Sequence, residues 1–107
     1  MTRTDFSLFA DALRAFRKPL TQRRLADLLG CDRTTVVRYE RGDRLPDPAQ
    51  VKQLLLLLDR PPELKEDLLS SWIACFRSAH AKKRTPLLVK YGLKEPVTDA
   101  QLLSLLS

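Results

Sequence analysis

Apolar residues recur along the first part of the chain at spacings of three and four, which is the period of an α-helix. One such stripe predicts a helix over about residues 5–17 and consists of Phe6, Phe9, Ala10, Leu13 and Phe16. Thr4 or Asp5 is suited to cap the start of this helix, and Pro19 stops it. The chain therefore opens with an amphipathic helix.

Three further helices are predicted from their end signals. Thr21 is a suitable N-cap for a helix that ends at Gly30. Asp32 begins the next helix, where its carboxylate is expected to accept hydrogen bonds from first-turn amides, and that helix ends at Gly42. Asp47 followed by a proline opens the fourth helix, whose apolar positions are Val51, Leu54, Leu55 and Leu58.

Pro61 and Pro62 separate this helix from a longer one over residues 62–80, in which Leu64, Leu68, Trp72 and Phe76 are spaced by four. A basic run at 82–84 follows, and then a short helical turn over about 85–92. Thr98 and Gln101 have the spacing of a capping box ahead of a last short helix. Because no segment alternates with period two, we expect an all-α fold.

The size and charge of the chain narrow the functional classes. A length of 107 residues fits one compact domain, and 19 basic against 13 acidic residues give a net charge of +6, which suits a polyanionic partner such as DNA, RNA or an anionic membrane surface. No apolar run is long enough to span a bilayer, and the two cysteines are far apart, so we expect a cytoplasmic protein with reduced thiols.

Candidate catalytic and metal-binding groups are missing from the sequence. His80 is the single histidine, no nucleophile is paired with a base, and no glycine-rich phosphate loop is present. We therefore expect no enzyme activity, no metal and no cofactor.

The second and third predicted helices meet a strict steric pattern. The turn between them is so short that they must cross steeply. A steep crossing needs a small residue on the first helix (Ala26), a residue that tolerates positive φ in the turn (Gly30) and a stiff apolar residue on the second helix (Val36). The three residues fall fifth, ninth and fifteenth counting from Gln22. This spacing predicts a helix-turn-helix.

The segment TQRRLADLLGCDRTTVVRYERG resembles the Cro/lambda-repressor-type helix-turn-helix, or XRE family. The resemblance covers roughly residues 13–58 and rests on Thr21, Gln22, Leu25, Ala26, Gly30, Val36, Tyr39, Glu40 and Gly42. It implies a lambda-repressor-like helix-turn-helix bundle, here with additional C-terminal helices, that binds double-stranded DNA and places its second motif helix in the major groove.

The resemblance also implies which residues contact DNA. The base-reading candidates are Arg33, Thr34, Thr35 and Arg38, and their side chains suit guanine acceptors and thymine methyls. Gln22 matches the family's phosphate-contacting glutamine, with Arg23, Arg41 and Arg44 as further phosphate-binding candidates. Glu40 is expected to pair with a helix-1 arginine such as Arg17, and Cys31, Cys75 and Trp72 are expected to pack.

We divide the chain into a DNA-binding module, residues 1–60, and a helical extension, residues 61–107, packed on the same domain. The leucine-rich extension predicts a homodimer, which would bind a palindromic operator as a transcriptional repressor. The alternatives are an antitoxin whose extension binds a toxin and which represses its own operon, and a protein-interaction factor that has lost DNA binding.

Overall fold

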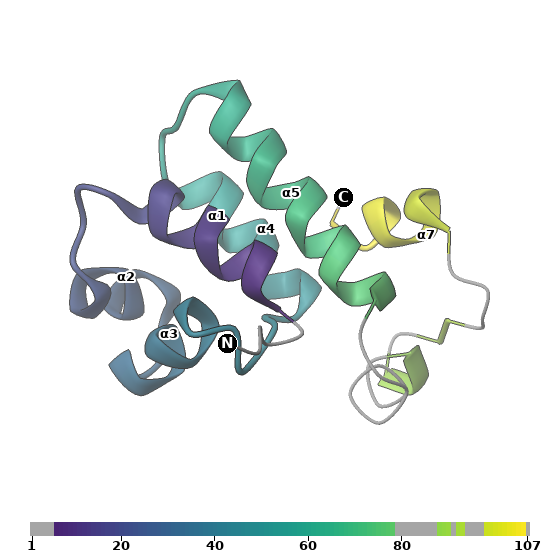
Figure 1. Ribbon diagram of the computed structural model, residues 1–107, viewed down its shortest axis with the longest axis horizontal. Coiled ribbons are helices and arrows are strands. Elements are labelled where there is room, and N and C mark those ends of the chain that lie inside the picture. Colours follow the sequence, from purple (N-terminus) through teal and green to yellow (C-terminus); the bar gives the residue numbers. More distant parts are fainter. Residues whose placement is uncertain (1–5, 79–87, 91, 94–97, 107) are drawn as a thin grey trace.

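The computed structural model describes residues 6–78, 88–90, 92–93 and 98–106, and it is all-helical, as predicted (Figure 1). Those residues contain no β-strand. Residues 88–90 form one further helical turn, and the other helices are α1 (Ser7–Arg17), α2 (Gln22–Leu29), α3 (Arg33–Glu40), α4 (Pro48–Leu57), α5 (Pro62–Ser78) and α7 (Asp99–Ser104).

Helix α1 is at the centre of the molecule. It lies between α5 on one side and the α2–α3 pair on the other (Figure 1). The whole predicted apolar stripe of α1 is buried. Burial of each large side chain of this kind contributes about 1.5–3 kcal/mol relative to exposure, so α1 is the element on which the others assemble.

The apolar stripe of α5 is covered by the same chain. Leu68, Trp72 and Phe76 are buried in one cluster with the α1 side chains, and Leu64 packs at its margin. The rings of Trp72 and Phe76 are in contact, with centroids 5.5 Å apart. Helix α5 therefore belongs to the core that supports α2 and α3.

Most helix starts have the predicted caps. The hydroxyl of Thr21 accepts from the Arg24 amide at 3.1 Å, the carboxylate of Asp47 accepts from the Gln50 amide at 2.9 Å, and Thr98 forms the predicted capping box with Gln101. Helix α1 begins after Phe6, and the expected caps Thr4 and Asp5 lie outside the described residues. So do His80 and the basic run at 82–84.

Asp32 departs from its predicted role. It occupies the N-cap position of α3, but its carboxylate accepts no hydrogen bond from the first turn. The amide of Thr35 instead bonds to the backbone carbonyl of Asp32 at 3.0 Å. At α4 the Gln50 amide bonds to both the backbone carbonyl and the carboxylate of Asp47, so the backbone bond alone does not exclude the Asp32 side chain.

Helices α2 and α3 are each followed by a glycine in the left-handed conformation. Gly30 has φ 68° and Gly42 has φ 78°. The amide of Cys31 bonds to the Ala26 carbonyl and that of Asp43 to the Arg38 carbonyl, each at 3.0 Å, which is the Schellman pattern. Helix α3 itself ends at Glu40, two residues before the predicted end at Gly42.

The loop between α3 and α4 is held from the C-terminal side. The indole nitrogen of Trp72 donates to the Pro46 carbonyl at 2.8 Å in a buried bond. The ammonium group of Lys90 lies 3.8 Å from the Asp47 carboxylate. The C-terminal segment thus contacts the loop that follows the helix-turn-helix pair.

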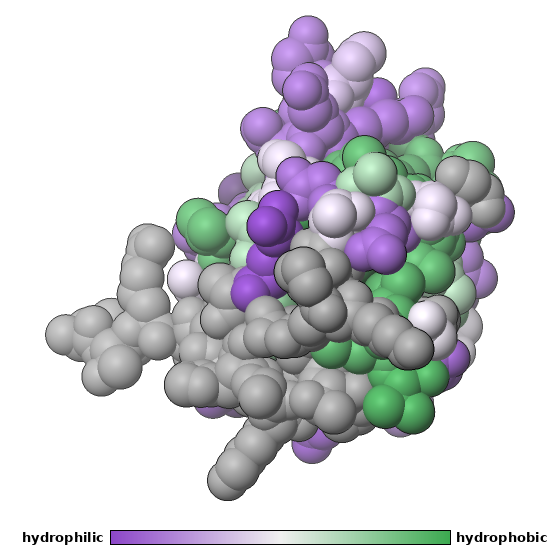
Figure 2. Space-filling view, turned by 90° about the vertical axis from the view of Figure 1, so that its right-hand side faces the viewer, coloured by the Kyte–Doolittle hydropathy of each residue, from purple (hydrophilic) through white to green (hydrophobic). Residues whose placement is uncertain are grey.

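The end of the molecule formed by the C-terminal residues carries both hydrophobic and hydrophilic side chains (Figure 2). Figure 2 shows hydrophobic side chains gathered on one side of this face, with hydrophilic ones above them. Val89 is 75% exposed and Leu103 is 41% exposed. The extension therefore presents apolar surface even though the α5 stripe is buried.

Candidate nucleic-acid interface

The α2–α3 pair has the interior that its sequence spacing predicts. Ala26 and Val36 are buried, as are Leu25, Leu29 and Tyr39, and Cys31 is half-buried in the turn. The small side chain of Ala26 and the stiff side chain of Val36 allow the two short helices to pack closely. The steric requirements of a helix-turn-helix are met.

Helix α3 has one buried and one open face. Val36, Tyr39 and Glu40 are buried, whereas Arg33, Thr34 and Arg38 are exposed, and Thr35 is half-buried with Val37. Within the described part of the chain, the side chains of Arg33 and Arg38 form no ion pair or hydrogen bond. The structure therefore places three of the four base-reading candidates outward together, with Thr35 at their edge.

Glu40 connects three elements. Its side chain is buried, and Arg17 of α1 donates from Nε to Oε2 at 2.6 Å and from Nη2 to Oε1 at 3.0 Å. Gln22, the first residue of α2, donates from Nε2 to Oε1 at 3.3 Å. The predicted Arg17–Glu40 pair is confirmed.

Gln22 remains a candidate phosphate contact, although its side chain also has an internal partner. It is half-buried at the start of α2, where its amide group is held by Glu40. This hydrogen bond uses one N–H of the side-chain amide and leaves the other N–H unused. The position of Gln22 is thus fixed by the same carboxylate that anchors α3.

The basic candidates surround α3. Arg23 is exposed on the first turn of α2, and Arg41 and Arg44 are exposed in the segment after α3. Arg41 lies 3.6 Å from the Asp43 carboxylate in a surface pair, which is a weak interaction. Arg24, which was not among the residues predicted from the sequence, is also exposed on the first turn of α2 and is a further basic candidate. Its adjacency to Arg23 is the sequence signal that could have indicated this.

The pKa values of Cys31 and Tyr39 show which charged groups lie near the turn between α2 and α3. Burial raises the pKa of the Cys31 thiol, the Asp32 carboxylate adds to this, and Arg44 lowers it. Burial also raises the pKa of Tyr39 to about 12, and its hydroxyl donates to the side chain of Gln50. The charges of Asp32 and Arg44 therefore both influence the Cys31 thiol in the turn. The Tyr39 phenol is neutral and packs in the core.

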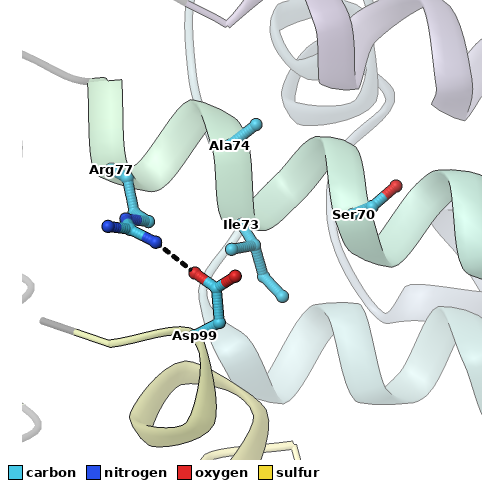
Figure 3. Close-up of a pocket in the computed structure, with 5 residues that line it drawn as sticks. All are labelled: Ser70, Ile73, Ala74, Arg77 and Asp99. Carbon is cyan, nitrogen blue, oxygen red and sulfur yellow. Dashed lines mark hydrogen bonds and ion pairs between the residues drawn. The ribbon is translucent and has the colours of Figure 1, made fainter.

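The described residues offer little to a small ligand or a metal. They contain no cluster of three or more potential metal ligands. A pocket of about 260 Å³ lies between α5 and α7 and is lined by Ser70, Ile73, Ala74, Arg77 and Asp99 (Figure 3). Arg77 and Asp99 form an ion pair of 2.5 Å across it.

None of the described helices is long and apolar enough to cross a membrane.

Comparison with known proteins agrees with this geometry. A family described as "Helix-turn-helix domain" matches residues 8–68, which is more than half of the chain. The matched segment runs from α1 into α5 and includes all the candidate DNA-contacting residues. Neither the curated proteins nor the solved structures gave a match.

Proposed function

The chain belongs to the helix-turn-helix domain family, and on that premise we propose that it is a sequence-specific transcriptional regulator that reads DNA with α3. One observation carries the proposal. Arg33, Thr34 and Arg38 are exposed on α3, and within the described residues their side chains form no hydrogen bond or ion pair, while the opposite face of that helix is buried. We assign the protein to DNA binding in the cytoplasm and not to catalysis.

The side chains on this face suit the major groove. An arginine can donate two hydrogen bonds to guanine O6 and N7, and a threonine can bond to a base or contact a thymine methyl. Arg33 and Arg38 are proposed as guanine readers, and Thr34 and Thr35 as the adjacent readers. Each good bidentate contact discriminates against the wrong base by about 1–3 kcal/mol.

Contacts to the DNA backbone are proposed for a second set of residues. Gln22 and Arg23 stand at the start of α2, and Arg41 and Arg44 follow α3, so the two groups flank the reading helix in sequence. Phosphate contacts of this kind fix the register without reading sequence. They also make the affinity fall steeply with salt, because each neutralised phosphate releases counterions.

We also propose that the regulator is a homodimeric repressor of a palindromic operator. One helix-turn-helix reaches few base pairs, and two copies one helical turn apart multiply the contacts. The exposed Val89 and Leu103 support a protein contact through the extension. They also support the alternative of an antitoxin with a toxin bound there. Sedimentation of the full chain with and without its selected DNA separates a dimer from a monomer.

The test of DNA reading is a selection of bound sequences from random DNA with the full chain. Arg33→Ala should lose the preference at one base pair, and Gln22→Ala should weaken all sequences alike. Arg44→Ala should lower the slope of log affinity against log salt by about 1.

Lys65→Ala is the control because it removes the same charge from α5, which α1 separates from α3 (Figure 1). No enriched motif for the wild-type chain would refute the proposed function. A motif that Arg33→Ala leaves unchanged would refute the contact assignment alone.

A further inference from the structure

Asp32 differs from the other N-cap residues that carry an oxygen in their side chains. Thr21, Asp47 and Thr98 each accept a first-turn amide through that oxygen, whereas Asp32 does not. The amide of Thr35 bonds to the backbone carbonyl of Asp32 at 3.0 Å and not to its carboxylate, whereas the amide of Gln50 bonds to both the carbonyl and the carboxylate of Asp47. Capping therefore does not account for this carboxylate.

The carboxylate is also free of other duties. Asp32 is exposed, and within the described residues its side chain forms no ion pair or hydrogen bond. It directly precedes Arg33 and Thr34, the first two residues of α3, which are exposed on the same turn. An unused acid thus stands at the edge of the surface proposed to enter the groove.

A negative charge in this position is costly unless it contacts a hydrogen-bond donor. DNA phosphates repel a carboxylate, and guanine O6 and N7 and thymine O4 present only acceptors in the major groove. The donors available there are the exocyclic amino groups, N4 of cytosine and N6 of adenine. A carboxylate that enters the groove is therefore satisfied only opposite one of these groups.

We propose that Asp32 is a specificity-determining residue that accepts a hydrogen bond from an exocyclic amino group in the major groove, with cytosine N4 as the expected donor. The contact falls on a base pair next to the one read by Arg33. This inference rests on the proposed function and adds a base position to the residues assigned above. It also makes Asp32 an element that rejects thymine and guanine at that position.

A second role for an acid at a helix start is electrostatic. Asp32 would then stabilise the positive end of the α3 dipole without touching DNA. The two roles differ in what they change. A dipole role alters the stability of the fold, whereas base reading alters the sequence preference.

The experiment compares the full-length wild type, Asp32→Ser and Asp32→Asn by selection from random DNA. Relative affinities are then measured on duplexes that vary one base pair at a time. Serine and asparagine are both good N-cap residues, so the start of α3 is retained. Asp27→Ser is the matched control, because it removes the same charge from an exposed position on α2. Urea unfolding of each variant reports any effect on stability.

For the wild type we expect cytosine or adenine at the position concerned, with a loss of about 5- to 150-fold when it is changed to thymine or guanine. Asp32→Ser should reduce that ratio to less than about twofold. Asp32→Asn should shift the preference toward adenine, because an amide pairs with adenine N6 and N7. Asp27→Ser should leave the motif unchanged.

A wild-type motif that both Asp32 variants and Asp27→Ser reproduce would overturn the inference and leave the proposed function standing. So would a change in unfolding stability at Asp32 with an unchanged motif, which would establish the dipole role. Absence of any wild-type motif would overturn the proposed function and this inference together.

Discussion

Tyr39 shows how burial sets the chemistry of one side chain in α3. Its ring is buried beside the α2–α3 turn, and its hydroxyl donates to Gln50 of α4. Burial raises the pKa of the phenol from 10.0 to about 12, because a charged phenolate would lose its solvation there. The neutral phenol donates to Gln50, and this hydrogen bond links α3 to α4.

The raised pKa predicts a loss of stability at high pH. The unfolded chain releases the Tyr39 proton near pH 10 and the folded chain near pH 12. Between these values the unfolded state binds fewer protons, so the free energy of unfolding falls as pH rises. Urea unfolding at about pH 8 and about pH 11 should show a larger loss for the wild type than for Tyr39→Phe. Equal losses would contradict the assignment.

The two acids at the ends of α3 differ in how far sequence alone predicted them. The residues of the family motif and the nearby Arg17 predicted that Glu40 is paired, since a buried carboxylate requires a partner. Asp32 fits an N-cap by residue type, and its position was predicted correctly. Its side-chain hydrogen bond was predicted wrongly, because residue type does not fix the side-chain rotamer: Asp47 accepts from its first turn and Asp32 does not.

At the scale of elements, Glu40 joins α3 to α1 and to the start of α2. Such a pair fixes the relative positions of helices that also meet through apolar contacts. Removing one partner would leave the other charge poorly solvated. The orientation of the reading helix therefore depends on a polar contact inside the bundle.

Glu40→Ala should lower the free energy of unfolding by about 3 kcal/mol, because it leaves Arg17 without its carboxylate. The double variant Arg17→Met with Glu40→Leu should recover most of that loss, since apolar side chains of similar size can replace a buried pair. Urea unfolding of the wild type and the variants measures both effects. A cost below about 1 kcal/mol for Glu40→Ala would show that the pair contributes little.

The segments that form helices were largely predictable, because apolar stripes and end residues depend on neighbouring positions in the sequence. The periodicity of α1 and the caps at Thr21 and Asp47 gave the correct elements. The extension that contains α5 was expected to pack on the same domain, but the surface that covers α5 was not predictable, because an amphipathic stripe does not specify its partner. The partners of Leu68 and Trp72 are set by tertiary packing against α1.

At the scale of the whole molecule, the core extends across the division at residue 60. Arg60 donates to the carbonyls of Phe16 and Arg17 at 2.7 and 3.2 Å, which satisfies the C-terminal end of α1. Helix α5 then covers the other side of α1. The division into 1–60 and 61–107 stays a prediction about function, and the shared core indicates that it is not a folding boundary.

A fragment of residues 1–60 should therefore lack a cooperative unfolding transition, because the α1 stripe loses the cover of α5. A fragment of residues 1–78 keeps α5 and should unfold cooperatively. Urea titrations followed by circular dichroism distinguish the two. A sharp transition for 1–60, similar to that of the full chain, would show that the first four helices fold alone.

The buried bond between Trp72 and the Pro46 carbonyl has a spectroscopic consequence. The chain contains one tryptophan, so its intrinsic fluorescence reports on a single place, the joint between α5 and the loop after α3. The folded chain should emit at short wavelength, and the emission should shift to the red when this joint opens. Titration with selected DNA would then show, without any added label, whether the loop that carries Arg44 moves as the complex forms.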